Sequence, residues 1–151
     1  MQDFVHLHVH TQYSLLDGQA SVARLVDKAM QNGMKGIAVT DHGNMFGIKE
    51  FTNYVNKKNS GPKGEIKDLK KRLVGIEAGS IECEDKEAEV AACKAKIVEA
   101  ENKLFKPIIG CEMYVARRTM DLKEGKQDQS GYHLIVLAKN ETGYHLSLIH
   151  I

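Results

Sequence analysis

The feature that most constrains this chain is a strictly alternating run near its N-terminus, Phe-Val-His-Leu-His-Val-His at residues 4–10. An extended strand directs successive side chains to opposite faces, with a period of two residues. The run therefore predicts a β-strand with one aliphatic face that can pack against helices. The opposite face would carry Phe4, His6, His8 and His10.

Helix and strand patterns follow this run in alternation. Ser21 is a suitable N-cap for a helix that extends to Asn32 with one apolar stripe, and Gly33 is a natural stop. A short strand is expected at residues 36–40, and a helix from about residue 47 to residue 57. Strand, helix, strand, helix at this spacing indicates parallel βαβ units.

Residues 59–105 interrupt that alternation. Two segments within them have apolar residues at alternating three- and four-residue steps, the spacing of a coiled-coil seam: Ile66, Leu69, Leu73 and Ile76, then Val90, Cys93, Ile97, Ala100 and Leu104. The first segment is rich in lysine and the second in acidic residues. We therefore expect an inserted antiparallel helical hairpin. It is either a solvated structural insertion or an arm that binds a partner.

The strand pattern resumes at residue 106. Residues 106–116 predict one strand and residues 133–138 predict another, largely buried strand, with a polar loop between them. After residues 141–144 a helix is due, yet the tail at 145–151 has strand periodicity and is atypical. We assign no function to the histidines of this tail.

Composition excludes several classes of protein. The net charge is +1 over 151 residues, so no strong overall field attracts nucleic acid. Cys83, Cys93 and Cys111 form no CxxC pair, which argues against a disulfide framework or a thiolate zinc site and fits a reducing cytoplasm. No signal-peptide pattern is visible, and no apolar stretch reaches the roughly 18 residues of a membrane span. We expect a cytoplasmic protein without a membrane partner.

Metal-binding side chains stand on or just after separate expected strands: His8, His10, Asp17, His42, Glu112 and His133. His8 and His10 would share a strand face about 7 Å apart at Cα, close enough to converge on one ion. Glu112 interrupts an apolar strand, and a buried carboxylate is costly unless it is paired or metal-bound. Imidazole and carboxylate together suit Zn²⁺, Mn²⁺ or Fe²⁺.

Ligands from several strands indicate more than one ion. In α/β barrels functional groups gather at one end of the strands. Metal ions about 3.5–4 Å apart can activate water and stabilise both oxygens of a phosphodiester. His6 would lie about 13 Å from His10 along the strand. We therefore take His6 and Asp41 as candidates to support the ligands rather than to bind metal.

Longer blocks of sequence resemble a known family. Residues 4–18 resemble the opening of the PHP (polymerase and histidinol phosphatase) domain, more narrowly as it occurs at the N-terminus of bacterial DNA polymerase III alpha subunits. Three further blocks match those subunits in order: Thr-Asp-His-Gly-Asn-Met-Phe-Gly at 40–47, Lys-Pro-Ile-Ile-Gly-Cys-Glu-Met-Tyr-Val-Ala at 106–116, and His-Leu-Ile-Val-Leu-Ala-Lys-Asn-Glu-Thr-Gly-Tyr at 133–144. The resemblance covers residues 4–58 and 106–144.

This resemblance implies an α/β fold, a distorted (β/α)₇ barrel that is incomplete here. Residues 1–58 and 106–144 would be its first part, residues 59–105 the helical-hairpin insertion, and residues 145–151 the atypical tail. Family members bind three metal ions with nine ligands, of which three would lie beyond residue 151. By resemblance the six others serve one ion through His8, His10 and Glu112, a second through Glu112 and His133, and a third through Asp17 and His42.

The resemblance also implies a function. The expected parent is a DNA-directed DNA polymerase of bacterial DNA replication, and this region resembles its metal-dependent phosphoesterase or 3′→5′ exonuclease module. Expected partners are DNA, a proofreading subunit and a sliding clamp, with Mg²⁺ serving the absent polymerase part. Alternatives are a stand-alone PHP phosphatase, similar to histidinol phosphatase, and a structural metal-binding module. With three ligands missing, we expect the 151-residue piece itself to be a poor catalyst.

Overall fold

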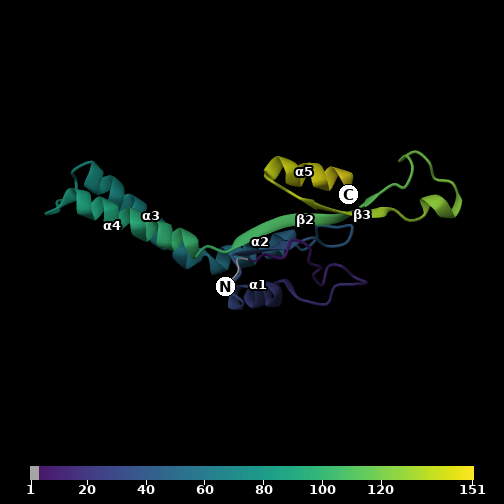
Figure 1. Cartoon of the computed structure of the whole chain (residues 1–151), viewed down its shortest axis with the longest axis horizontal. Helices are drawn as coiled ribbons and strands as arrows, with labels where there is room; N and C mark the ends of the chain where they lie inside the picture. The colour runs from purple at the N-terminus through teal and green to yellow at the C-terminus, as the bar shows by residue number, and fades with distance from the viewer. Residues whose placement is uncertain (1–3) are drawn as a thin grey trace. The chain divides into compact units, whose positions relative to one another are not determined.

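The computed structural model describes residues 4–151, which form two compact units (Figure 1). The sheet unit comprises residues 4–54 and 106–151, and the helical unit comprises Val55–Phe105. Residues 1–3, which were expected to begin the first part of the domain, lie outside the described residues. Each unit is described below by itself.

The sheet unit is built on three strands in the order β1-β2-β3. β1 (Gly36–Val39) pairs in parallel with the first half of β2 (Lys106–Val115), with Gly36 opposite Lys106. β3 (Tyr132–Leu137) pairs antiparallel with the second half of β2, with Val115 opposite Tyr132. The expected mixed α/β class is thus confirmed, and β2 is the strand that joins the other two.

The antiparallel β2–β3 pair corrects the expectation that the strands continue as parallel βαβ units. A parallel neighbour needs a crossover connection, usually an α-helix. The connection at residues 116–131 contains one short 3₁₀ turn, η1 (Gly125–Asp128), and no α-helix to cross the sheet. β3 is also mostly exposed rather than largely buried, since in the described chain it forms an edge of the sheet.

The histidine-rich run at residues 4–10 lies beside β1 but does not form the regular strand predicted from its alternation. The Ala38 amide donates to the His6 carbonyl, and the Thr40 amide donates to the Val9 carbonyl, both at 2.9 Å. The two acceptors, His6 and Val9, are three positions apart in the sequence, whereas the two donors, Ala38 and Thr40, are two positions apart. This extra residue acts as a bulge does, and it breaks the strict alternation of faces within the run.

The sheet unit contains two whole α-helices, α1 (Val22–Gln31) and α5 (Glu141–His150), and the first part of α2 (Ile48–Lys58), whose residues from Val55 onward belong to the helical unit. The ends of α1 are as expected from sequence: the Ser21 side chain accepts from the Arg24 amide at 3.4 Å, and Gly33 follows with φ of 75°. Among the described residues, no helix combines the length and apolar character that a bilayer span requires.

Helix α5 corrects the strand-like expectation for the tail. Its N-cap is Asn140, whose side chain accepts from the Gly143 amide at 2.9 Å. A capped first turn satisfies an amide that an extended tail would leave without an intrachain partner. This local signal prevails over the period-two spacing of a short apolar stretch.

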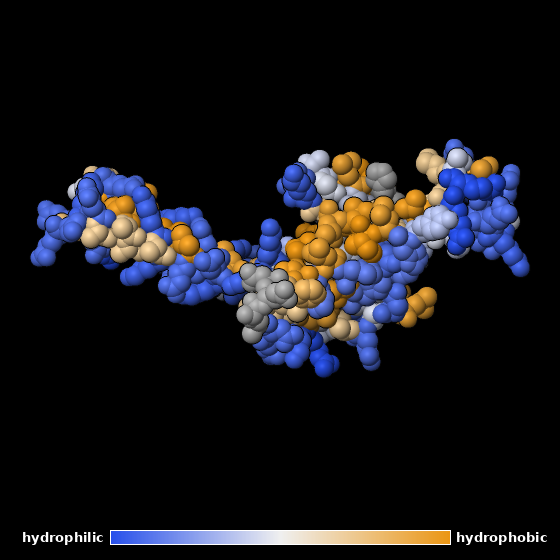
Figure 2. Space-filling view, in the orientation of Figure 1, coloured by the Kyte–Doolittle hydropathy of each residue, from blue (hydrophilic) through white to orange (hydrophobic). Residues whose placement is uncertain are grey.

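The core of the sheet unit forms where helices cover β1. Val22 and Val26 of α1, Val39 of β1 and Phe51 of α2 are each at most 1% exposed. Burying one such side chain contributes about 1.5–3 kcal/mol. Apolar surface also remains visible on this unit in the space-filling view, over the part where Figure 1 draws β2 and β3 (Figure 2).

The helical unit contains α3 (Ser60–Glu77) and α4 (Lys86–Asn102), which pack against each other. The buried residues of the two helices all belong to the apolar spacing seen in the sequence: Ile76, Cys93, Ile97 and Ala100. Ion pairs join Lys70 to Glu101 at 3.4 Å and Glu77 to Lys94 at 3.9 Å. Because all four of these side chains are exposed, each pair adds at most a small amount to stability.

Within the helical unit, one asparagine joins the two ends of residues 59–105. Asn59 donates through Nδ2 to the Phe105 carbonyl at 2.8 Å and accepts through Oδ1 from the Phe105 amide at 3.0 Å. Both residues are buried, at 5% and 3% exposure. The side-chain amide thus replaces the water that these two backbone groups would otherwise need.

We expect Asn59→Ala to lower the free energy of unfolding by about 1–3 kcal/mol, because it leaves a buried amide and a buried carbonyl without partners. The measurement is chemical denaturation followed by circular dichroism. Asn53→Ala is the matched control, since Asn53 is an exposed residue of α2. Equal stability of the two variants would contradict the role assigned to Asn59.

Candidate metal centre

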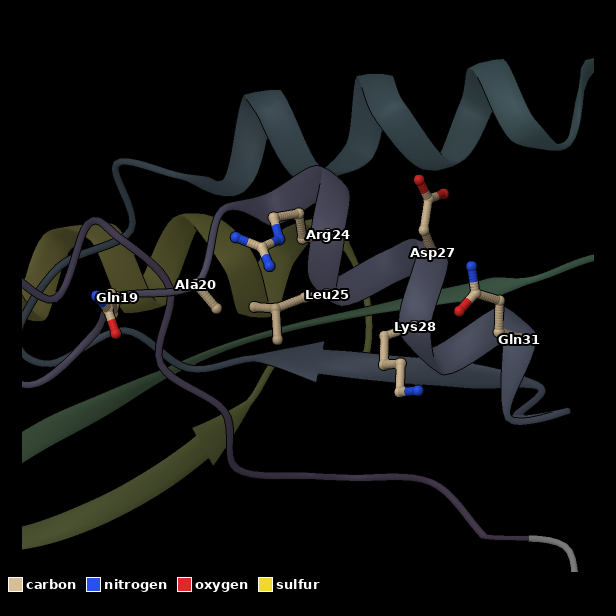
Figure 3. A pocket seen from close by; sticks show the side chains of 7 residues that line it. All are labelled: Gln19, Ala20, Arg24, Leu25, Asp27, Lys28 and Gln31. Atoms are coloured by element: carbon tan, nitrogen blue, oxygen red, sulfur yellow. The ribbon is translucent and has the colours of Figure 1, made fainter.

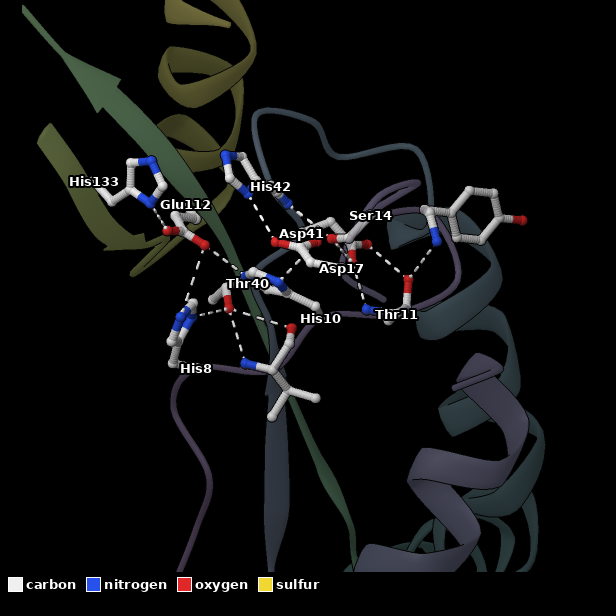
Figure 4. A network of polar contacts seen from close by, with 12 residues as sticks. His8, His10, Thr11, Ser14, Asp17, Thr40, Asp41, His42, Glu112 and His133 are labelled. Atoms are coloured by element: carbon white, nitrogen blue, oxygen red, sulfur yellow. Dashed lines mark hydrogen bonds and ion pairs between the residues drawn. The ribbon is translucent and has the colours of Figure 1, made fainter. Parts of the chain in front are cut away.

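The structure brings the six sequence-predicted ligands into one cluster within the sheet unit (Figure 4). They come from five places in the chain: the N-terminal run, the loop that follows it, the turn after β1, and the strands β2 and β3. In sequence order they are His8, His10, Asp17, His42, Glu112 and His133.

Glu112 stands at the centre of the cluster. Its Oε2 lies 2.6 Å from His10 Nε2 and 3.7 Å from His8 Nε2, and its Oε1 contacts His133 Nδ1. The residue is 5% exposed. One buried carboxylate therefore faces three imidazoles from the N-terminal run and β3.

Asp17 extends the cluster on the other side of His10. Its Oδ1 lies 3.2 Å from His10 Nδ1, and its Oδ2 lies 3.0 Å from His42 Nδ1. His10 is therefore placed between two carboxylates, with one ring nitrogen near each. The loop carrying Asp17 is more open to solvent, and the Asp17 side chain is 42% exposed.

Two sets of donor atoms are compact enough to hold an ion. The atoms of His8, His10 and Glu112 lie within 4.8 Å of one another, as do those of His10, Asp17 and His42. Metal–nitrogen and metal–oxygen bonds are about 2 Å long, so two donors on one ion are at most about 4 Å apart. Small side-chain movements would therefore close either set, and imidazole with carboxylate is a donor set suited to Zn²⁺, Mn²⁺ or Fe²⁺.

The electrostatics of the cluster favour ionised carboxylates. Burial by itself raises the pKa of Glu112, but the hydrogen bond from His10 and the charges of the surrounding histidines outweigh burial and leave that pKa below its usual value. The hydrogen bond from His42 lowers the pKa of Asp17, and the charge of His10 lowers it further. Both groups are thus in the deprotonated form that binds metal.

Asp41 supports the cluster from behind. It is 1% exposed and accepts from the Thr11 amide at 2.6 Å, the Thr11 hydroxyl at 2.8 Å and the Ser14 hydroxyl at 3.0 Å. The Ser14 oxygen in turn accepts from the His42 amide at 2.9 Å. These bonds tie the loop that carries Asp17 to the end of β1, as a supporting residue should do.

Gly18 closes the same loop. A Cβ at this position would lie 1.8 Å from the Thr11 carbonyl oxygen and 2.9 Å from the Ser14 Cβ. No side chain fits there without moving the backbone. The glycine that follows Asp17 is therefore required for the turn that presents the carboxylate.

Two contacts of the histidines were missed from sequence. The Thr40 hydroxyl lies 2.9 Å from His8 Nδ1, and the Tyr114 hydroxyl contacts His42 Nε2. Both hold ring nitrogens that do not face the carboxylates, which is how neighbouring groups orient metal-binding histidines. Tyr114 lies two residues after Glu112 on β2, so the period of a strand was a usable signal.

His6 is not brought to the cluster. Its ring packs edge-on against Phe4 at 4.8 Å between centroids, and it lines a hollow together with Val9 and Leu25. Within residues 4–151 the structure gives it no hydrogen bond, ion pair or ring contact with the six ligands. The prediction that His6 shares a face with His8 and His10 was wrong, because the extra residue in the run interrupts the alternation after His6.

Another hollow, of about 810 Å³, lies along α1 (Figure 3). Its lining mixes opposite charges, with Arg24 and Lys28 beside Asp27, and includes neither histidine nor a pair of carboxylates. Because its two cations outnumber its one carboxylate, this lining does not suit a metal ion. The cluster around Glu112 is the stronger candidate for a functional site.

Comparison with known proteins identifies the family of the chain. The chain belongs to the PHP domain family, whose sequence profile matches residues 6–151. Similar proteins include the DNA polymerase III subunit alpha of Treponema pallidum, 39% identical over 142 residues, and that of Borreliella burgdorferi, 38% identical over 144 residues. The protein of the same name from Aquifex aeolicus is 31% identical over 148 residues. These alignments cover 93–94% of this chain but only 8–9% of each relative.

We expect Glu112→Gln to weaken Zn²⁺ or Mn²⁺ binding at least tenfold. Loss of a supporting residue around a metal ligand already costs about 10–100-fold, and here the central charge itself is removed. Isothermal titration calorimetry of the apo protein measures the affinity. Glu82→Gln makes the same chemical change at an exposed residue of the helical unit and should leave binding unchanged. Equal affinities for both variants would rule out Glu112 as the centre of the site.

Proposed function

We propose that the sheet unit is part of a metal-dependent phosphoester hydrolase module. The observation that supports this most is the contact of Glu112 with His8, His10 and His133. A carboxylate at 5% exposure surrounded by imidazoles is the arrangement of an ion site, because a cation offsets the cost of burying the charge.

The proposed ligands divide among three ions in the complete domain. His8, His10 and Glu112 would hold one, Glu112 and His133 a second, and Asp17 and His42 a third. An ion there supplies a Lewis acid for a phosphoryl oxygen and lowers the pKa of a bound water. The chain's own contribution is orientation: Thr40 and Tyr114 fix the rings of His8 and His42.

We further propose that the module belongs to a bacterial DNA polymerase III alpha subunit. The similar proteins from Treponema pallidum, Borreliella burgdorferi and Aquifex aeolicus carry that name. On this proposal the larger protein is a DNA-directed DNA polymerase in the cytoplasm, with Mg²⁺ in its polymerase site. Its partners would be DNA, a proofreading subunit and a sliding clamp. The hydrolysed bond would be a phosphodiester at a DNA 3′ end.

The helical unit is proposed to be an antiparallel hairpin inserted at residues 59–105. The support is the packing of α3 against α4 and the Asn59–Phe105 hydrogen bonds that bring its ends together. All six proposed metal ligands lie in the sheet unit. The hairpin therefore supplies none of the six proposed ligands.

Metal-dependent hydrolysis is tested with bis-p-nitrophenyl phosphate and with a 3′-labelled single strand of DNA, at fixed Mn²⁺ or Zn²⁺. The 151-residue protein is assayed beside a version extended through the remainder of the barrel, each with its Glu112→Gln variant. We expect turnover in the extended protein, its loss in the variant, and little turnover in the shorter protein.

The outcomes separate the alternatives. Metal binding without hydrolysis by the extended protein would favour a structural metal module. Hydrolysis of a small phosphomonoester but not of DNA would favour a phosphatase of the histidinol-phosphatase kind. Equal turnover by the shorter and extended proteins would mean that the six ligands suffice and that no further ones are needed.

Replacing residues 61–103 by a short Gly/Ser linker should leave metal affinity within about twofold of the full chain. The variant retains Asn59 and Phe105, whose hydrogen bonds already bring the two ends together, so a short flexible loop can close the gap. Calorimetric titration with Zn²⁺ provides the comparison. Loss of binding in a folded deletion variant would show that the hairpin supports the centre.

A further inference from the structure

A hollow of about 290 Å³ adjoins the metal centre on the side of Asp17 and His42. Besides these two residues, its lining is mostly apolar or aromatic, from two loops and β2: Tyr13, Leu15, Leu16, Asn44, Phe46 and Tyr114. A volume of this size is at the lower limit of small-molecule sites. It suits one small group rather than an extended ligand.

Several apolar side chains of this lining stand in solvent. Leu15 is 88% exposed, Leu16 is fully exposed at 102%, and Phe46 is 77% exposed. Single exposed apolar residues are common and need no explanation. Three of them gathered around a hollow that shares side chains with a polar centre are characteristic of a ligand site.

The walls of the hollow are held by hydrogen bonds. Asn44 donates to the carbonyls of Tyr13 and His42, both at 3.1 Å, and accepts from the Phe46 amide at 3.2 Å. The Tyr13 hydroxyl donates to Glu50 at 2.7 Å, which fixes the other end of that ring. One asparagine thus links the two loops that form the hollow, so the hollow exists before a ligand arrives.

The charge of the lining limits what it can bind. It contains the Asp17 carboxylate and the His42 ring but no lysine or arginine. A second phosphate would therefore be repelled from its walls unless an ion neutralised it. The exposed aromatic ring of Phe46 instead favours an uncharged, flat group, since the Tyr114 ring already packs against His42 and His133.

We propose that this hollow binds the base of a nucleoside 5′-phosphate whose phosphate lies at the metal centre. The proposal rests on the proposed function, because the centre must hold the phosphate. Stacking on an aromatic ring accepts every base, so the subsite would select for a nucleotide without selecting its sequence. A DNA 3′ terminus and a free mononucleotide both offer this group.

The first experiment compares dAMP with deoxyribose 5-phosphate, which lacks the base, by calorimetry at saturating Mn²⁺. Stacking of one base on an aromatic side chain corresponds to roughly a 5- to 150-fold change in affinity, and we expect dAMP to bind about tenfold more tightly. Phe46→Ala should abolish this preference without changing the affinity for deoxyribose 5-phosphate, and Phe46→Tyr should retain it.

Val98→Ala is the control, because Val98 is an exposed apolar residue of α4 in the helical unit, 56% exposed. A preference for dAMP that persists in Phe46→Ala would overturn the location of the subsite. Equal binding of both phosphates to the unaltered protein would overturn the subsite but leave the proposed function intact. If neither dAMP nor deoxyribose 5-phosphate bound in a metal-dependent way, both the subsite and the proposed function would be contradicted.

The second experiment distinguishes the two sources of the nucleotide. A tetranucleotide with an ordinary 3′-terminal residue is compared with one whose 3′-terminal residue is abasic. A loss of affinity on removing the terminal base, again dependent on Phe46, assigns the subsite to DNA ends. A base preference seen with dAMP alone assigns it to free mononucleotides.

Discussion

The rest of the sheet unit depends on the buried charge of Glu112. The Glu112 carboxylate lies in the middle strand of the sheet, and its partners come from the N-terminal run and from β3. An uncompensated buried carboxylate costs several kcal/mol, a large share of the stability of a small domain. The histidines are therefore a structural necessity as well as candidate ligands. The contact between His10 and Glu112 therefore also holds the N-terminal run against the sheet.

Asp41 is a second buried carboxylate, and it lies behind the six proposed ligands. It is buried, and its three acceptor bonds go to residues of one loop, Thr11 and Ser14. That loop ends with Asp17 and Gly18, so its shape sets the position of a second carboxylate. An ion bound by Asp17 and His42 would stabilise the loop in return, because binding energy to a site formed only on folding is also folding energy. The centre and the loops around it are thus expected to form together.

Sequence reasoning succeeded where the signal was local or chemical. The ends of α1 followed from Ser21 and Gly33. The six residues chosen by type and by position beside strands lie together in the structure, and their binding of metal stays a prediction. Sequence reasoning failed at two tertiary pairings and at one local helix cap. The extra residue at the N-terminal run separates His6 from His8, and no pattern in the sequence marks it. The direction of β3 depends on which neighbour the strand finds, and the α5 cap at Asn140 outweighed the spacing of the tail. Tyr114 and Thr40 were missed because neither residue type commonly signals a metal site.

The position of the helical unit in the chain has a low thermodynamic cost. His10 and Glu112 are separated by 102 residues, and residues 59–105 account for nearly half of that separation. Doubling the length of a closed loop costs only about 0.6 kcal/mol in chain entropy. The Asn59–Phe105 bonds reduce the cost further, since they join the ends of the insertion inside the helical unit. The chain that connects the N-terminal histidines to Glu112 then behaves as if it were much shorter. An insertion at this point therefore leaves the carboxylate–histidine contacts nearly as favourable as they would be without it.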